Sequence, residues 1–287
     1  LPSALAASRP DALGMLILDA ELVLPGALEV VASVCPQTRV VVIADDVDPA
    51  LLSATHRIPR LVGFLGRALG AARDWELGYL VRRLLVSPAG WDTAAPATHE
   101  LLPPGAATVT FRPRTSGDRD RVVEAVELAA TNLGVHRRTA AAAADAAHEL
   151  LMNALYDAPV DAAGTPKFAG DRRAAIALDD GEVPVLRLTI DADHVALDVT
   201  DPFGRMTRDR LFDRLYRART APDGGAMLDT SHGGAGLGLF KLWSTGSILR
   251  FDVVPGQTTH VAWVVDRRVA LQAQRSQPRS LYFVGVD

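Results

Sequence analysis

The stretch HELLMNALYDAP, residues 148–159, continues an alanine-rich run and carries polar side chains at intervals of four. Glu149, Asn153 and Asp157 would share one face of a helix that has 3.6 residues per turn. The apolar residues between them are expected to point elsewhere: Leu150, Leu151, Ala154 and Leu155. A polar stripe on an apolar helix predicts that something polar lies beside that face.

The sequence around this helix predicts a layered α+β domain. Helices are expected over 118–133 and 138–157, and a strand over 108–111 opens the domain. Two later pairs of strand-like runs are each joined by a short turn and are expected to form hairpins: 183–190 with 194–201, and 247–254 with 259–266. Grouped helices followed by strands favour a mixed sheet with its helices on one face.

The N-terminal part alternates strands and helices, which predicts a parallel sheet. Strands are expected over 14–22, 39–46 and 61–68, and helices over 27–34 and 75–85. The predicted fold class is therefore α/β, with four segments: an α/β domain over 1–95, a linker over 96–108, an α+β domain over 109–268 and a tail over 269–287. The tail could add an edge strand.

Composition excludes some classes of function. The formal net charge of −4 gives no overall attraction to nucleic acid or to an anionic membrane, so neither is expected as a partner. The single cysteine, Cys35, excludes an internal disulfide and a multi-cysteine metal site, which fits a reducing compartment. The sequence contains no run of 18 apolar residues, so no membrane span is predicted. A cytoplasmic location is expected.

The sequence DPFG, Asp201–Gly204, ends one predicted strand. A carboxylate at a strand end can accept a hydrogen bond from an exocyclic amine, and a glycine leaves room for a flat ring to approach the backbone. The alternative is a simple turn, since aspartate, proline and glycine all favour turns.

The sequence HGGAGLGLFKLW, residues 232–243, places glycines ahead of a predicted helix. Backbone N–H groups in such a segment can converge on phosphate oxygens, and the helix N-terminus adds a partial positive charge. The spacing matches neither the dinucleotide fingerprint nor a Walker loop. A flexible loop is the alternative.

Taken in order, these motifs resemble the GHKL ATPase and histidine-kinase superfamily, which has the Bergerat nucleotide-binding fold. The order is E-x-x-x-N on a helix, D-x-x-G after a strand, a long polar loop, G-G-x-G-x-G at a helix start and a threonine opening the last strand, over about residues 105–266. The helical run before the first motif is similar to anti-sigma-factor serine kinases. DPFG departs from the commoner D-x-G-x-G, and 158–182 looks like an insertion.

The resemblance implies that ATP or ADP binds with Mg²⁺. Asn153 would be the magnesium ligand, Glu149 would orient or deprotonate the attacking group, and Asp201 would read adenine with support from Gly204 and Thr259. Further nucleotide contacts are implied for Asp157, Gly233, Gly234, Gly236, Leu237 and Gly238. Residues 205–232 would form the mobile lid.

The predicted lid contains the arginine-rich helix TRDRLFDRLYRART, residues 207–220. One of its arginines could clamp the terminal phosphate. The alternative, preferred for any single arginine, is an amphipathic helix whose arginines face solvent or pair with Asp209 and Asp213.

The N-terminal part resembles the second half of a response-regulator receiver domain, which is flavodoxin-like. Asp19 would stand where receivers carry the phosphorylated aspartate. Ala44 replaces the expected threonine or serine, and Gly66 and Arg67 stand where a lysine is expected. These departures indicate a degenerate receiver used for docking, and a strand-end cap is the favoured alternative role of Asp19.

The sequence thus predicts a bacterial, ATP-binding signal-transduction protein with a partner of the anti-sigma or phosphorelay type. It could be a protein serine kinase or an anti-sigma-type regulator. The alternative is a non-catalytic binding module that responds to nucleotide. Whether ATP is turned over stays open, and a homodimer is expected only by analogy.

Overall fold

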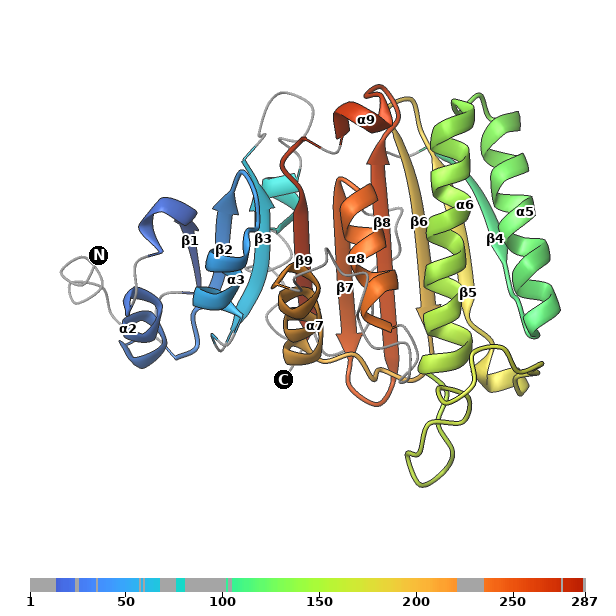
Figure 1. Ribbon diagram of the computed structural model, residues 1–287, viewed down its shortest axis with the longest axis horizontal. Helices are drawn as coiled ribbons and strands as arrows, with labels where there is room; N and C mark the ends of the chain where they lie inside the picture. Colours follow the sequence, from blue (N-terminus) through green and yellow to red (C-terminus); the bar gives the residue numbers. More distant parts are fainter. Residues whose placement is uncertain are drawn as a thin grey trace.

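One mixed sheet runs through the molecule in the computed structural model (Figure 1). The structure describes residues 14–23, 26–34, 36–56, 58, 60–67, 76–80, 102, 105–220, 235–274 and 276–285. In this part of the chain the sheet has nine strands in the order β1-β2-β3-β9-β7-β8-β6-β5-β4. The molecule is therefore a mixed α/β structure, as predicted.

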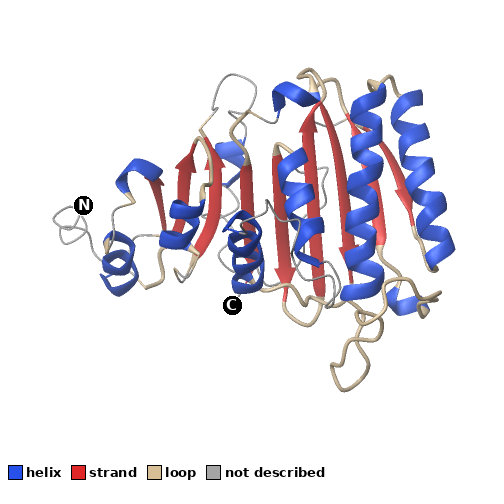
Figure 2. Ribbon diagram, viewed as in Figure 1, coloured by secondary structure: helices blue, strands red, loops and turns tan. Residues whose placement is uncertain are grey.

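The helices and strands, coloured by type in Figure 2, agree closely with those predicted from the sequence. The strands are β1 (Met15–Asp19), β2 (Arg39–Ala44), β3 (Leu61–Gly66), β4 (Ala107–Phe111), β5 (Val185–Ile190), β6 (His194–Asp201), β7 (Ile248–Val254), β8 (Thr258–Asp266) and β9 (Ser280–Gly285). The helices are α2 (Ala27–Val34), α3 (Pro49–Thr55), α5 (Ser116–Asn132), α6 (Arg137–Met152), α7 (Arg208–Thr220), α8 (Ala235–Thr245) and α9 (Leu271–Gln274). Short 3-10 turns cover Ala20–Leu22 and Asp180–Glu182, and a π turn covers Asn153–Asp157.

The strands β1, β2 and β3 pair in parallel, which confirms the parallel sheet predicted for the N-terminal part. Their apolar runs are buried because α2 and α3 cover them, and Leu18, Val42 and Phe64 join one core. Residues 76–80 are helical, and the rest of the helix predicted over 75–85 lies outside the described residues.

Both predicted hairpins are present, since β5 pairs with β6 and β7 pairs with β8 in antiparallel fashion. The predicted strand over 108–111 is β4, which pairs with β5. Helices α5, α6, α7 and α8 lie on one face of the sheet, in front of it in Figure 1. On that face Val195, Leu197 and Val199 of β6 belong to the same core as the helices.

Local signals explain where the two long helices begin. Thr115 caps α5 in a reciprocal capping box: its side chain accepts from the N–H of Asp118, whose carboxylate accepts from the N–H of Thr115. The side chain of His136 caps α6. Buried alanines such as Ala140, Ala143 and Ala147 let α6 pack closely on the sheet.

The tail does not add an edge strand, and that prediction is wrong. Its strand β9 lies inside the sheet, antiparallel to β3 and parallel to β7. Leu281 and Phe283 face one core, whereas Tyr282 and Val284 face the other, so the run is apolar on both sides. At Gly63 of β3 a side chain would overlap the carbonyl of Leu281, so the close pairing requires glycine there.

Strand β9 joins the strands of the predicted N-terminal and C-terminal segments into one sheet. Much of the predicted linker over 96–108 lies outside the described residues. Among the residues that the structure describes, no helix combines the length and the apolar character needed to span a bilayer.

Candidate functional site

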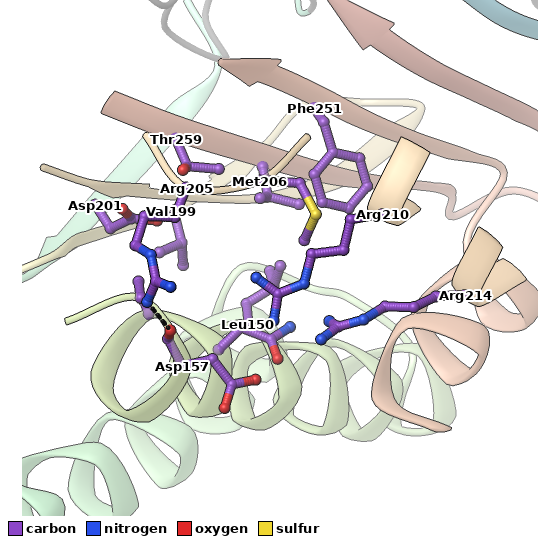
Figure 3. Close-up of a pocket in the computed structure, with 14 residues that line it drawn as sticks. Leu150, Asp157, Val199, Asp201, Arg205, Met206, Arg210, Arg214, Phe251 and Thr259 are labelled. Carbon is purple, nitrogen blue, oxygen red and sulfur yellow. Dashed lines mark hydrogen bonds between the residues drawn. The ribbon is translucent and has the colours of Figure 1, made fainter. Parts of the chain in front are cut away.

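A pocket opens where the end of α6 faces strands β6, β7 and β8 (Figure 3). Its lining residues come from α6 and its π turn, the three strands, the segment after β6 and α7: Leu150, Asn153, Ala154, Asp157, Ala158, Val199, Asp201, Arg205, Met206, Arg210, Arg214, Phe251, Thr259 and Val261.

Helix α6 ends in a π turn where it reaches the pocket. The turn begins at Asn153 and ends at Asp157, and both residues line the pocket as the sequence predicted. π turns inside helices are rare and frequently mark functional sites. Two residues expected to point elsewhere, Leu150 and Ala154, also line the pocket, so that part of the helical-face prediction is wrong. Leu150 and Ala154 are four residues apart and share the pocket-facing side of the helix with Asn153 and Asp157.

Glu149 lies to one side of the pocket and is absent from its lining. Its Oε1 is 3.4 Å from Nζ of Lys241 in α8, and the same lysine is 3.8 Å from Asp145. A side chain at Gly238 would overlap the Glu149 carboxylate, so Glu149 packs against the start of α8. Of the three polar residues expected on one face of α6, Asn153 and Asp157 therefore line the pocket, whereas Glu149 packs against α8.

Asp201 is buried at the end of β6 and lines the pocket. Burial raises the pKa of its carboxyl from the usual 3.8 to about 7, although hydrogen bonds from the Phe203 N–H and the Thr259 hydroxyl oppose this shift. Thr259 stands directly opposite Asp201 in the β6–β8 pairing. The two predicted adenine-reading residues are thus brought together.

The DPFG segment is also a turn, which confirms its alternative interpretation, and the adenine-reading interpretation stays a prediction. The N–H of Phe203 donates to Asp201 Oδ1 over 3.0 Å, which is a local turn contact. Gly204 has φ of 59°, and a side chain there would overlap the carbonyl of Val254. Gly204 therefore packs against the β7–β8 turn and holds the strand end in place.

Three arginines also line the pocket, and Arg205 lies beside Asp201 (Figure 3). Arg205 donates to the carbonyl oxygen of Asp157 over 3.3 Å, and Arg210 and Arg214 extend from α7 toward the end of α6 (Figure 3). Within the described chain, the guanidinium groups of Arg210 and Arg214 have no hydrogen-bond or ion-pair partner. Burial and, next in size, the charge of Arg210 lower the pKa of Arg214 to about 10.

The arginine helix confirms part of the amphipathic interpretation, and the phosphate clamp stays a prediction. Arg208 pairs with Asp209, as the amphipathic alternative predicted. Arg210 and Arg214 are one turn apart and share the pocket-facing side of α7. Their spacing of four was visible in the sequence, but only the packing of α7 identifies which face meets the pocket.

Arg172 is absent from the lining of this pocket but contacts two residues that line it, and the sequence analysis missed this. Its Nε donates to Asp157 Oδ1 over 3.0 Å, and its Nη2 pairs with Asp157 Oδ2 and lies 3.4 Å from Asn153 Oδ1. Arg172 comes from the segment predicted as an insertion, 158–182, which Tyr156 anchors by donating its hydroxyl to the carbonyl of Ala174 over 2.9 Å. A segment without periodicity gave no signal for this pairing.

The donors around Asn153 suit a magnesium ion poorly. Magnesium prefers octahedral coordination by oxygens, commonly with a carboxylate among its ligands. Here Arg172 pairs with Asp157 and contacts Asn153, and Arg205 donates beside them. Across the described residues no group of three or more acidic, histidine or cysteine side chains could hold a metal.

The glycine motif is described only in part. Gly233, Gly234 and residues 221–232 of the predicted lid lie outside the described residues. Gly236 and Leu237 belong to the first turn of α8, where only the backbone is described. Gly238 is buried against Glu149. The predicted phosphate contacts of these residues stay predictions.

Asp19 lies at the end of β1, distant in the strand order from the pocket. Arg67 donates to both of its carboxylate oxygens, one of them over 2.9 Å, and the Glu21 N–H donates to Oδ1 over 3.0 Å. These hydrogen bonds, first of all those from Arg67, lower the pKa of Asp19. Asp19 therefore acts as a strand-end cap, and its phosphorylation stays a prediction.

Comparison of the chain with protein-family models, with curated proteins and with solved structures found no match.

Proposed function

We propose that the pocket binds ATP or ADP and that the protein acts as an ATP-binding component of signal transduction. The observation that carries this proposal is the polarity of the pocket. A buried carboxyl, that of Asp201, lies at the end of β6, and Arg210 and Arg214 of α7 line the same pocket, their guanidinium groups without a hydrogen-bond or ion-pair partner in the described chain. An adenine nucleotide has a matching arrangement, with an amine on its base and negative charge on its phosphates.

The base would lie between apolar walls. Val199, Val261, Phe251 and Met206 line the pocket, so a flat ring would find dispersion contacts there. The exocyclic amine would donate to the Asp201 carboxylate. Phe203 and Thr259 already donate to this buried carboxyl, and a bound amine would add a further donor, which favours an amine-bearing base.

The phosphates would lie against Arg210 and Arg214. Guanidinium groups bind phosphate oxygens through paired hydrogen bonds, which are among the stronger polar contacts in proteins. The start of α8 would supply backbone N–H groups, as the glycines ahead of it suggest. The order of the motifs, which resembles the GHKL superfamily, supports the same assignment.

The signalling part of the proposal rests on the second face of α7. Phe212 packs edge-on to Phe64 of β3 with ring centroids 5.9 Å apart, and Tyr216 stacks on His56 at 5.0 Å. Arg208 donates to the Ile58 carbonyl over 2.7 Å. One helix thus contacts the nucleotide pocket and the receiver-like strands, so a change at the pocket can alter the surface offered to a protein partner.

In this proposal the protein works in the bacterial cytoplasm on a partner of the anti-sigma or phosphorelay type, alone or as a homodimer. The geometry favours a nucleotide-responsive module over a kinase. Glu149, which would orient or deprotonate the attacking group in a kinase, is paired with Lys241 beside the pocket.

The second candidate is a protein serine kinase. The observation that favours it is the position of Glu149 against Gly238, at the start of the helix proposed to meet the phosphates. Incubation with radiolabelled ATP and candidate partners would detect transfer, and Glu149→Gln should abolish it while leaving binding intact. Intact ATP after long incubation would favour the binding module.

Calorimetric titration with ATP tests the proposed function. The wild type should bind, and Asp201→Asn should weaken binding about tenfold or more, because an amide accepts the amine less strongly than a carboxylate does. Asp180→Asn, at an exposed aspartate far from the pocket lining, is the matched control. Equal affinity of wild type and Asp201→Asn would contradict the assignment.

A further inference from the structure

We infer that this pocket binds the phosphates of its nucleotide without a divalent cation, because Arg172 occupies the position beside Asn153 and Asp157 where a metal would act. The inference rests on the proposed nucleotide binding and concerns how the same site neutralises its ligand. Asp157 is the only carboxylate among the described lining residues at the end of α6.

Arg172 uses both its Nε and its Nη2 to hold Asp157. The two side chains are each 16% exposed, so water screens the pair only in part. The same Nη2 lies 3.4 Å from the Asn153 amide oxygen. The guanidinium thus faces both side chains that could offer oxygens to a metal, and it already supplies the positive charge that Asp157 requires.

The groups around Asp157 carry more positive charge than its one carboxylate can balance. Arg172 pairs with the Asp157 carboxylate, and Arg205 donates to the backbone carbonyl of the same residue. Arg210 and Arg214 line the pocket close enough for the charge of Asp157 to act on both. Arg214 is partly buried among these like charges and has no partner within the described chain. A polyanion would relieve this repulsion, whereas a divalent cation would add to it.

The shape of the contacts points to phosphate in particular. Arg210 and Arg214 offer planar guanidinium forks from α7 and line the pocket, whereas Arg172 holds Asp157 without being part of the lining. Forks of this kind bind phosphate oxygens in pairs and need no metal to do so. The expected ligand is therefore the metal-free polyphosphate of a nucleoside di- or triphosphate.

The direct experiment is calorimetric titration of the full chain with ATP in EDTA and, separately, in excess Mg²⁺. Binding in EDTA that is as tight as in Mg²⁺, or tighter, is the expected result. Binding that requires Mg²⁺ would overturn this inference and leave nucleotide binding intact. Absence of binding under both conditions would overturn the proposed function and the inference with it.

Arg172→Gln tests the role of the guanidinium itself. The variant loses a charge-assisted contact, so its affinity for ATP in EDTA should fall about tenfold or more. It also frees Asp157 beside Asn153, so Mg²⁺ should now strengthen ATP binding, which it does not do in the wild type. A role confined to holding the 158–182 segment would not create this magnesium dependence.

Arg173→Gln is the matched control, since Arg173 is an exposed neighbour whose guanidinium, unlike that of Arg172, makes no hydrogen bond to Asp157 or Asn153 in the described chain. It should bind ATP like the wild type under both conditions. Should Arg172→Gln fail to fold, Arg214→Gln gives a second test, and its affinity for ATP in EDTA should also fall about tenfold. Unchanged affinity of a folded Arg172→Gln or Arg214→Gln would overturn the inference.

Discussion

Asp19 and Asp201 each end a β-strand, and the sequence offered a functional role for both, but their surroundings differ. Asp19 is partly exposed and held by Arg67, so its charge is already compensated and its pKa is lowered. Asp201 is buried without an ion-pair partner in the described chain, and its pKa is raised to about 7. A strand-end aspartate whose charge is satisfied internally has a structural role, whereas one left unsatisfied at a pocket is available to a ligand.

The largest effect should appear in the pH dependence of stability around Asp201. Its folded pKa of about 7 lies above the usual 3.8, so the folded state holds the proton more tightly than the unfolded state. This stabilisation is complete below about pH 4 and is lost as the pH rises through 7. The loss amounts to a few kcal/mol, at about 1.4 kcal/mol per pKa unit.

Chemical denaturation at several pH values, with Asp201→Asn beside the wild type, measures this effect. The variant lacks the titrating group, so the difference in unfolding free energy should shift in its favour between pH 4 and pH 8. A difference that does not change with pH would mean that Asp201 is not buried as described, and the contrast with Asp19 would disappear.

A smaller loss is expected for Gly204→Ala, which tests how Asp201 is held. At φ of 59° alanine is strained, and its Cβ would overlap the Val254 carbonyl, so the free energy of unfolding should fall by about 2–3 kcal/mol. Gly181→Ala is the control, because nothing lies near its added Cβ. Equal stability of the two variants would show that the DPFG turn tolerates a side chain.

The smallest effect is expected at Asp19. Its folded pKa is lowered, so the stabilisation exists above about pH 4 and is lost as the pH falls through the folded value. Asp19→Asn should cost little at neutral pH, because exposed ion pairs contribute little, and should leave ATP affinity unchanged. Calorimetry and denaturation check both points, and a lost response to ATP would give Asp19 a functional role.

Local patterns predicted much of this fold. Alternating apolar residues predicted the two hairpins, and turn residues predicted their ends. The position of β9 was not predictable in this way. Its run SLYFVG is apolar on both faces, which indicates a buried strand, but the choice of β3 and β7 as partners depends on contacts distant in sequence.

The site was predictable where a motif determines it and not elsewhere. Asn153, Asp157, Asp201 and Thr259 follow recognisable motifs and meet in one pocket. Arg172 lies in a segment without periodicity, so only tertiary packing brings it to Asp157. The π turn likewise has no local sequence signal.

The measurement that tests the central claim most directly is a calorimetric comparison of ATP with inosine triphosphate. The two share their phosphates, but inosine carries an oxygen where adenine carries the amine that Asp201 would accept from. ATP should bind about tenfold or more tightly than inosine triphosphate, because the oxygen offers no donor to the buried carboxyl where the amine of adenine would. Equal affinities would contradict the claim that Asp201 reads the base.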